Sequence, residues 1–193
     1  CVDWWMSGKD PKEKCKVSKA IHEVDILKQN ISKTNSMFES IPVLYINLAH
    51  RKDRSEKVLK EFEFAGFSKN MIHRIDAVPA KNGQFGALMS QLKCLKYAID
   101  NDYDMVLIAE DDLYWSIRTN LIRGILEKNL HDPTWSVLLL SCYLGKFSHR
   151  NEVSDFITNS NCQTATAYIV RKPYYRTLYN HWNSYLERKL VFR

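Results

Sequence analysis

Residues 104–112 read Asp-Met-Val-Leu-Ile-Ala-Glu-Asp-Asp, so an apolar run leads directly into three carboxylates. The run is short and contains Val and Ile, which favour a pleated backbone, and this predicts a strand buried on both faces. In open α/β sheets, ligands bind at the carboxyl ends of such strands. Glu110, Asp111 and Asp112 would repel one another there unless a cation or hydrogen-bond donors offset their charge. Two interpretations stay open: a divalent-metal site for a phosphorylated ligand, or solvated acids that cap the next helix.

The chain before this stretch predicts two more strands, each followed by a helix. Strands are expected over residues 42–48 and 72–77. Asp53 and Glu56 have the spacing of a capping box, and Gly66 is a natural helix stop. Apolar residues at helical spacing mark the two helices: Val58, Leu59, Phe62 and Ala65 in the first, and Leu88, Leu92, Leu95 and Ile99 in the second. The order β-α-β-α-β predicts a largely parallel sheet covered by helices.

Two loops of this pattern are candidates for ligand contact. The basic loop from Arg51 to Arg54 lies between the carboxyl end of a strand and the start of a helix, where an anion would be received. A solvated basic turn is the alternative. Residues 79–86 contain Pro79, Gly83 and Gly86, which predicts a loop whose backbone lies close to a ligand.

The C-terminal part continues the alternation of strands and helices. We expect Leu113 in the core, and Tyr114 and Trp115 either in the core or stacked on a ligand ring. A helix around residues 121–126 ends at 131–133, and strands are expected over 135–142 and 163–170 with a polar loop, 143–161, between them. Pro173 suits the start of a final helix. The apolar residues of that helix are Tyr174, Leu178, Trp182 and Tyr185.

The N-terminal region differs from the rest. Val17, Ile21, Val24, Leu27 and Ile31 recur at helical spacing, and a polar linker follows. We therefore expect an N-terminal extension over residues 1–40, with an amphipathic helix and a linker, and one main domain over 41–193. The five cysteines fit no zinc spacing, and their odd number argues against a full disulfide framework.

Composition narrows the function classes. The chain has 193 residues with 45% hydrophobic and 26% charged residues, which is ordinary for a globular domain. Its net charge of +6 allows nucleic acid, an anionic membrane face or a phosphate-bearing ligand as partner. The basic residues are interleaved with acids rather than gathered in one stripe, so we expect no nucleic-acid binding. No transmembrane segment is expected, and peripheral membrane contact stays open. The chain begins with Cys1 rather than Met; we expect a cytoplasmic protein, or a lumenal or secreted one if a leader has been removed.

Three spaced features together resemble glycosyltransferase family 25, which contains lipopolysaccharide and procollagen galactosyltransferases. They are Ile46-Asn47-Leu48 followed by Arg51 and Asp53-Arg54; Arg74 and Ala77 followed by Gly83-Gln84-Phe85-Gly86 and Ser90; and residues 107–112. Residues 166–170 also look like a late strand of the family. The resemblance covers roughly residues 41–172. It implies a GT-A-like fold, with a single Rossmann-type, mostly parallel sheet flanked by helices.

The resemblance also implies an activity. The chain would be a metal-dependent transferase that moves a hexose, galactose or glucose, from a UDP-sugar to a hydroxyl of a glycan or protein acceptor, by an inverting route. The acidic triplet would act as a D-x-D element for Mn²⁺ or Mg²⁺, since hard carboxylate oxygens suit either ion. The implied metal ligands are Asp112, directly, and Glu110, through water or as a ribose partner.

Donor contacts are implied for a further set of residues. Asp111 would contact the ribose or sugar, Asn47 and Leu48 the base and ribose, and Arg51 and Arg54 the nucleotide or its phosphates. Gly86 and Ser90 belong to the second donor-binding feature. The general base is not identified by the resemblance, and Asp155 in the polar loop is a candidate for it.

The chain departs from the family at a few points. Ala87 follows Gly86 where the family usually has cysteine, and Gln91 follows Ser90 where it usually has histidine. Glutamine keeps hydrogen-bonding capacity but does not titrate near neutral pH. The region after Tyr168 is also short for the family. These departures keep a second hypothesis open, a degenerate transferase fold that binds a nucleotide sugar or glycan without turnover. A metal-dependent phosphohydrolase is a third, although no D-x-D-x-T motif follows the strand.

Overall fold

The computed structural model describes residues 37–115, 119–141, 143–144, 149–150, 157–158, 162–163 and 166–191. The helix expected over residues 17–31, the linker after it and the candidate base Asp155 lie outside these ranges. The described part begins with a short 3-10 helix at Met37, close to the expected start of the main domain at residue 41.

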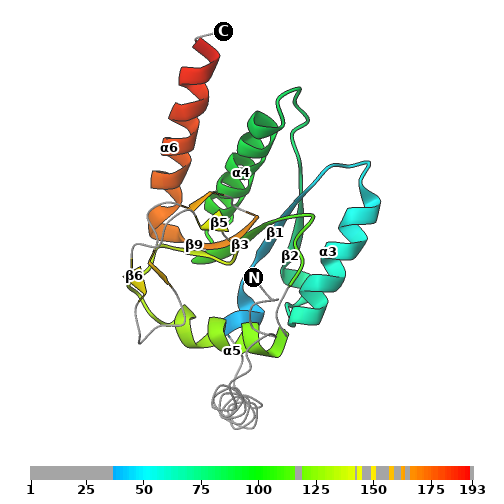
Figure 1. Ribbon diagram of the computed structural model, residues 1–193, viewed down its shortest axis with the longest axis vertical. Helices are drawn as coiled ribbons and strands as arrows, with labels where there is room; N and C mark the ends of the chain where they lie inside the picture. The colour runs from blue at the N-terminus through cyan, green and yellow to red at the C-terminus, as the bar shows by residue number, and fades with distance from the viewer. Residues whose placement is uncertain are drawn as a thin grey trace, which may run out of the picture.

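The described chain forms an α/β fold (Figure 1). The predicted order β-α-β-α-β over the first half is confirmed. In chain order the elements are η1 (Met37–Ser40), β1 (Val43–Asn47), α3 (Lys52–Ala65), η2 (Lys69–Met71), β2 (Ile72–Asp76), α4 (Gly83–Asp100), β3 (Met105–Glu110), α5 (Thr119–Leu130), β4 (Val137–Leu139), β5 (Tyr143–Leu144), β6 (His149–Arg150), β7 (Ile157–Thr158), β8 (Cys162–Gln163), β9 (Ala167–Arg171) and α6 (Lys172–Val191).

One five-stranded sheet organises these elements, in the order β2-β1-β3-β9-β4. β1 pairs in parallel with β2 and with β3, which places β1 between them. β9 runs antiparallel to both of its neighbours, β3 and β4. The sheet is therefore mixed with a parallel part, in agreement with the expected Rossmann-type arrangement. The parallel part brings the carboxyl ends of β1, β2 and β3 to one edge.

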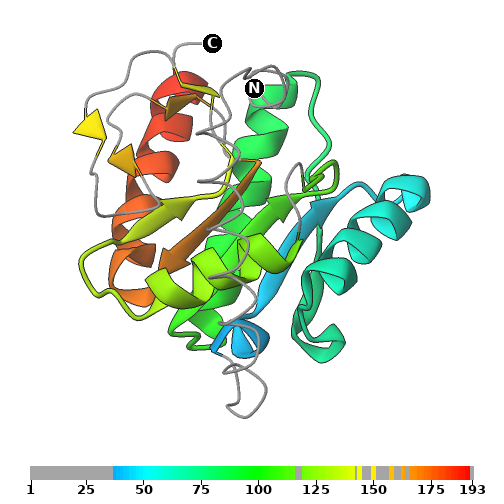
Figure 2. The same cartoon turned by 60° about the horizontal axis from the view of Figure 1, so that its bottom comes forward.

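The sheet is covered on both faces, because alternate residues of each strand point to opposite sides. On one face the strands pack against α3 and α5, and on the other against α4 and α6. Figure 2 shows α5 in front of the sheet, with α4 and α6 behind it. Residues 106–109 of β3 have no exposed surface, which confirms the prediction of a strand buried on both faces.

Each face has its own hydrophobic core. The core under α3 and α5 includes Val43, Tyr45, Val58, Phe62, Leu107, Ala109, Ile122, Leu126 and Ile169. The core under α4 and α6 includes Leu44, Ile46, Leu95, Ala98, Val106, Ile108, Tyr168, Val170 and Tyr175. Side chains of one strand thus alternate between the two cores, and the same alternation decides on which face each polar residue at the strand ends lies.

The start of α3 differs from the prediction. The helix begins at Lys52 and its N-cap, Arg51, makes no side-chain capping hydrogen bond. Asp53 lies within the first turn, so the expected capping box of Asp53 and Glu56 is wrong. The physical reason is a competing partner, because the carboxylate of Asp53 accepts two hydrogen bonds from the Arg51 guanidinium, at 2.9 and 2.8 Å. An acid in the first turn still favours the helix dipole.

The end of α3 follows the prediction. Gly66 has φ of 90°, in the left-handed region that side chains with a Cβ rarely adopt, and its amide donates to carbonyls of the last turn. The buried stripe is narrower than expected. Val58, Phe62 and Ala65 are buried, whereas Leu59 is 37% exposed.

Other boundaries also shifted. α4 begins at Gly83, so the loop expected over residues 79–86 is shorter, and Asn82 caps the helix by accepting a hydrogen bond from the amide of Gln84. β4 covers only residues 137–139 of the strand expected over 135–142, and β9 begins at Ala167 rather than at residue 163. Three short strands, β5, β6 and β7, lie within the expected polar loop; β6 pairs with β7, and β5 pairs with β8, which directly follows the loop. In α6, Tyr185 is 44% exposed, although Tyr174, Leu178 and Trp182 pack against the core as expected.

None of the described helices has the length and apolar character that crossing a lipid bilayer would require.

Candidate functional site

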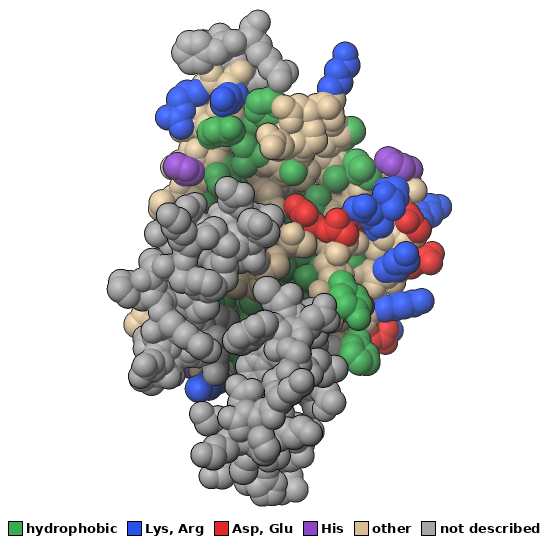
Figure 3. All heavy atoms as spheres, viewed as in Figure 1, with side chains coloured by type: hydrophobic (Ala, Val, Ile, Leu, Met, Phe, Trp, Pro, Cys, Tyr) green, Lys and Arg blue, Asp and Glu red, His purple; other side chains and the backbone are tan. Residues whose placement is uncertain are grey.

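The candidate site lies where the parallel strands β1 and β3 end. Asn47 is the last residue of β1 and Glu110 the last of β3, and Asp111 and Asp112 follow in a turn. After β1 the chain makes a tight turn, in which the amide of Arg51 donates to the carbonyl of Leu48 at 2.8 Å, and α3 begins. Acidic side chains lie directly beside Lys and Arg side chains on the face that Figure 3 shows.

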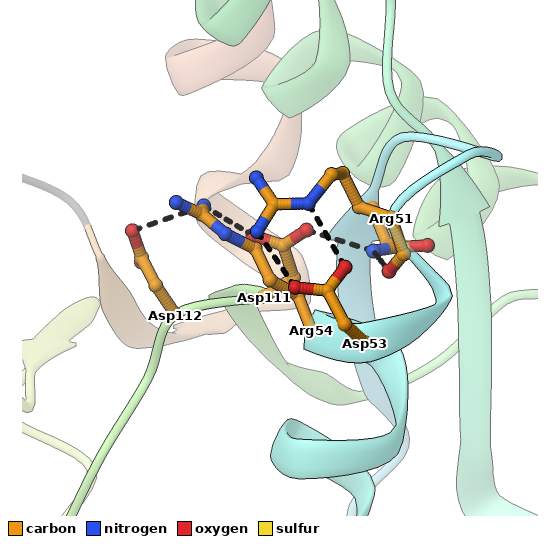
Figure 4. Close-up of polar contacts among 6 residues, drawn as sticks. Arg51, Asp53, Arg54, Asp111 and Asp112 are labelled. Carbon is orange, nitrogen blue, oxygen red and sulfur yellow. Dashed lines mark hydrogen bonds and ion pairs between the residues drawn. The ribbon is translucent and has the colours of Figure 1, made fainter.

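Asp111 is held from two sides. Its Oδ2 accepts a hydrogen bond from the side-chain amide of Asn47 at 2.7 Å, and its Oδ1 lies 3.0 Å from Nη1 of Arg54. The same Nη1 lies 3.4 Å from Oδ2 of Asp112 (Figure 4). One guanidinium nitrogen of Arg54, in α3, therefore contacts two carboxylates at the end of β3. The positive charge of Arg54 between the two acids offsets their mutual repulsion.

The two carboxylates differ in exposure. The side chain of Asp111 is 11% exposed, whereas that of Asp112 is 52% exposed. A ligand that arrives from solvent therefore meets Asp112 first, and Asp111 forms the floor behind it.

Asn47 connects the site to the neighbouring strand. It is only 1% exposed, and its side-chain amide also donates to the carbonyl of Arg51 at 3.0 Å. Its carbonyl oxygen accepts from Nε of Arg74 in β2 at 3.0 Å, and Arg74 forms an ion pair with Asp76 at 2.8 Å. A continuous polar chain thus runs across the ends of β2, β1 and β3 to α3. The amide of Asn47 has three partners and is buried, so it positions Asp111.

Arg51 is occupied by Asp53 rather than by the acidic triplet. Hydrogen bonding to Asp53 raises the pKa of the Arg51 guanidinium, and the same contact holds the pKa of the Asp53 carboxyl well below its usual value. The two arginines of the loop therefore have separate partners. Of these two, Arg54 is the one that contacts Asp111 and Asp112.

Glu110 is the last residue of β3 and is partly buried. In β3 it shares a face with Ile108 and Val106, which belong to the core under α4 and α6. Burial raises the pKa of Glu110, the negative charges of Asp112 and Asp111 raise it further, and Arg54 lowers it. The three acids interact electrostatically, and among the described residues Arg54 forms ion pairs with Asp111 and Asp112.

Gly86 and Ser90 hold the loop after β2. The hydroxyl of Ser90 accepts a hydrogen bond from the amide of Val78 at 2.8 Å and donates to the carbonyl of Gly86 at 2.6 Å, and Ser90 is 1% exposed. A Cβ on Gly86 would lie 2.6 Å from the carbonyl oxygen of Val78. The close backbone approach at Gly86 is therefore to the chain itself. Whether Gly86 and Ser90 also contact a donor stays a prediction.

This packing leads to a stability prediction. Gly86→Ala forces the Val78 carbonyl aside and is expected to lower the free energy of unfolding by roughly 1–3 kcal/mol. Gly83→Ala is the matched control, since nothing lies within 4 Å of a Cβ there, and it is expected to be neutral or slightly stabilising. Urea unfolding of both variants measures the difference. Equal stability of the two variants would show that the loop after β2 adapts freely.

Gln91 follows Ser90 in α4. It is 4% exposed, and its Oε1 accepts a hydrogen bond from the hydroxyl of Tyr168 at 2.8 Å. In this chain the side chain at that position links α4 to β9 inside the core.

The three apolar and aromatic residues after the acids lie in two different environments. Leu113 is buried, as expected, and Trp115 packs against the core with its indole N–H donating to the carbonyl of Glu61 at 3.2 Å. Tyr114 is 75% exposed, so its ring faces solvent two residues after Asp112. Of the two residues whose place the sequence left open, Trp115 packs against the core and Tyr114 lies at the surface.

The donor set fits a hard divalent cation that shares its shell with a ligand. Among the described residues, no three His, Cys, Asp or Glu side chains converge to hold an ion by themselves. Mg²⁺ and its relatives are commonly bound through one or two carboxylates together with substrate phosphates. Asp111 and Asp112 already accommodate one positive group, the Arg54 guanidinium, between them. Two carboxylates that converge on a cation are consistent with such a site.

Arg74 is a site residue to which the sequence alone assigned no role. The signal was present, since Arg74 is a charged residue in the middle of an expected strand, two positions before Asp76. What the sequence lacked was the register, in which Tyr45 pairs with Arg74 and Asn47 with Asp76. That register brings the Arg74 guanidinium to the Asn47 side chain.

Comparison with known proteins adds no assignment to this geometry. No protein-family model matches the chain, and no curated protein matches it significantly.

Proposed function

We propose that this chain is a metal-dependent glycosyltransferase that moves a hexose, galactose or glucose, from a UDP-sugar to a hydroxyl of a glycan or protein acceptor. The observation that carries the proposal is the pair Asp111 and Asp112 at the carboxyl end of β3, joined by Arg54 from the first turn of α3. Carboxylates and a guanidinium at one sheet edge suit a ligand that brings both a cation and phosphates.

The proposal gives each residue of the site a role. Asp112, the exposed carboxylate, binds the cation, and Asp111 forms the floor and contacts the ribose or sugar. Arg54 faces the phosphates. Asn47 and Arg74 hold Asp111 in place through their hydrogen bonds. Leu48 lines the turn on which the nucleotide would lie.

The chemistry of the transfer calls for such a site. When the glycosidic bond to the donor breaks, negative charge develops on the leaving diphosphate, and fixed positive groups at that position lower the barrier. A bound Mn²⁺ or Mg²⁺ supplies Lewis-acid stabilisation of that leaving charge. The chain contributes the carboxylates that hold the ion and a guanidinium with several N–H donors for phosphate oxygens. The acceptor hydroxyl also needs a base, for which Asp155, outside the described residues, stays the candidate.

A binding module without turnover is the second candidate, and the environment of Gln91 favours it. This position holds no titratable side chain, and the Tyr168 hydroxyl occupies its Oε1 in the core. If the family histidine acts in catalysis, a chain with Gln91 would bind a nucleotide sugar and release it unchanged.

Ligand-induced stabilisation tests the proposal. UDP and Mn²⁺, both millimolar, are expected to raise the melting temperature by about 5–10 °C if the ligand concentration is roughly 100 times Kd. Differential scanning fluorimetry with UDP, Mn²⁺ and both together measures the effect, with AMP and Ca²⁺ as comparison ligands. A melting temperature that does not respond to any combination would contradict both the transferase and the nucleotide-binding module.

A further inference from the structure

The guanidinium of Arg54 uses only part of its hydrogen-bonding capacity. Both of its contacts to the acids, 3.0 Å to Asp111 and 3.4 Å to Asp112, are made by Nη1. Within the described part of the chain, Nε and Nη2 of Arg54 have no hydrogen-bond partner, and the side chain is 38% exposed. Two of its three nitrogens are therefore available to a ligand that enters from solvent.

The two acids hold Arg54 unequally. Asp111 is nearly buried and is fixed from behind by the Asn47 amide at 2.7 Å. Asp112 is half exposed, its contact to Arg54 is longer, and no other side chain in the described ranges pairs with it. An exposed ion pair of this kind contributes little to stability. The contact to Asp112 is the one that breaks at little cost.

A guanidinium and a divalent cation cannot both occupy the space between the acids. The Arg54 charge is permanent, because arginine does not deprotonate in proteins. An ion that binds Asp112 would meet this charge at close range, and like charges repel strongly at a partly buried site. The ion and Arg54 therefore compete for Asp112.

We propose that Arg54 is an exchangeable counter-cation: it neutralises Asp112 in the free protein, gives it up to the entering divalent cation, and then binds the diphosphate while keeping its bond to Asp111. This inference rests on the proposed function, and it goes further by making cation and diphosphate binding interdependent. The cation alone must displace Arg54. The diphosphate gives the displaced guanidinium a new partner, so each ligand favours the other.

The exchange gives the site a selectivity that neither acid has alone. A free divalent cation binds weakly, since it removes a counter-ion and offers none in return. A free nucleotide binds weakly, since Arg54 is still shared with the acids. With both ligands bound, the cation takes the place of Arg54 on Asp112, phosphate oxygens bind Nε and Nη2, and Nη1 keeps its bond to Asp111. The site thus favours a diphosphate that arrives with its cation.

Binding of Mn²⁺ alone, followed by Mn²⁺ with UDP, tests the inference without any need for turnover. The variant is Arg54→Gln, and the matched control is Lys60→Gln, which removes one exposed positive charge further along α3. Arg54→Gln is expected to bind Mn²⁺ alone about fivefold to tenfold more tightly than the wild type, because the competitor is gone. Lys60→Gln is expected to stay within about twofold of the wild type. Electron paramagnetic resonance of free Mn²⁺ measures each affinity.

The second half of the experiment measures the coupling. UDP is expected to increase the Mn²⁺ affinity of the wild type, and to increase that of Arg54→Gln by about tenfold less. Arg54→Lys keeps the charge and is expected to retain weak binding of Mn²⁺ alone, which separates competition by charge from any change in folding. Circular dichroism melts check that each variant is folded.

The outcomes separate the inference from the proposed function. Equal or weaker Mn²⁺ binding by Arg54→Gln, with UDP coupling intact, overturns the exchange and leaves the metal-dependent transferase standing. Absence of Mn²⁺ binding in the wild type, with and without UDP, overturns both. Tighter binding by Arg54→Gln together with reduced coupling supports the exchange.

Discussion

Asp112→Asn is expected to abolish the Mn²⁺-dependent stabilisation by UDP and to lower the rate of donor cleavage by roughly 100-fold to 1,000-fold. Asparagine keeps the size of the side chain but removes the negative charge that holds the cation. Since the Asp112 side chain is half exposed and its only contact is the long one to Arg54 within the described ranges, the fold itself should be affected little. Thermal melts with UDP and Mn²⁺ measure binding, and release of UDP from a UDP-sugar measures cleavage.

Asp100→Asn is the matched control for this substitution. Asp100 is a carboxylate at the end of α4 that pairs with Lys96 at 2.8 Å, away from the strand ends that form the site. Its loss is expected to leave the UDP response unchanged. An Asp112→Asn variant that still responds to UDP and Mn²⁺ like the wild type would remove Asp112 from the metal site.

Asn47→Ala is expected to have the largest effect on stability, a loss of roughly 2–4 kcal/mol in the free energy of unfolding. The side chain is 1% exposed, and its removal takes one hydrogen bond each from the Arg51 carbonyl, the Asp111 carboxylate and the Arg74 Nε. In a chain of this size, such a loss lowers the melting temperature by about 5–15 °C. Urea unfolding monitored by circular dichroism measures it.

Asn70→Ala serves as the comparison for Asn47→Ala. Asn70 is exposed, and within the described residues its side chain accepts one hydrogen bond, from the Ser68 hydroxyl, so its loss is expected to stay within about 0.5 kcal/mol. Similar stabilities of the two variants would mean that the polar chain from Arg74 to Asp111 is not formed in solution. The placement of Asp111 would then need another cause.

The central part of the fold could be predicted from the sequence because its signals are local. The apolar run of β3 is too short for a helix and is followed by polar residues, and each of the first two helices shows apolar residues at helical spacing. Gly66 marks the end of α3 through its positive φ. These features depend on a few neighbouring residues, so a linear sequence reveals them.

Features that depend on which of several possible partners a side chain takes, or on elements far apart in the sequence, could not be predicted. The capping box at Asp53 failed because the Arg51 guanidinium takes the carboxylate. β4 and β9 are shorter than expected, since strand length depends on where the neighbouring strand ends.

The candidate site shows the same division. The residue types around β3 and the basic loop pointed to one sheet edge, and the structure brings Asn47, Arg54, Asp111 and Asp112 together there. The partners were not predictable. Arg51 pairs with Asp53, and Ser90 holds the loop after β2.

Donor cleavage measures the central claim most directly. UDP-galactose, UDP-glucose, other UDP-sugars and GDP-sugars are incubated with the wild type and with Asp112→Asn, with Mn²⁺ or with a chelator, and released nucleotide is quantified. We expect Mn²⁺-dependent release of UDP from UDP-galactose or UDP-glucose by the wild type, and its loss in Asp112→Asn and with the chelator. A folded wild type that binds UDP and Mn²⁺ but releases UDP from none of these donors, even with glycan and protein acceptors present, would contradict the transferase and leave a binding module.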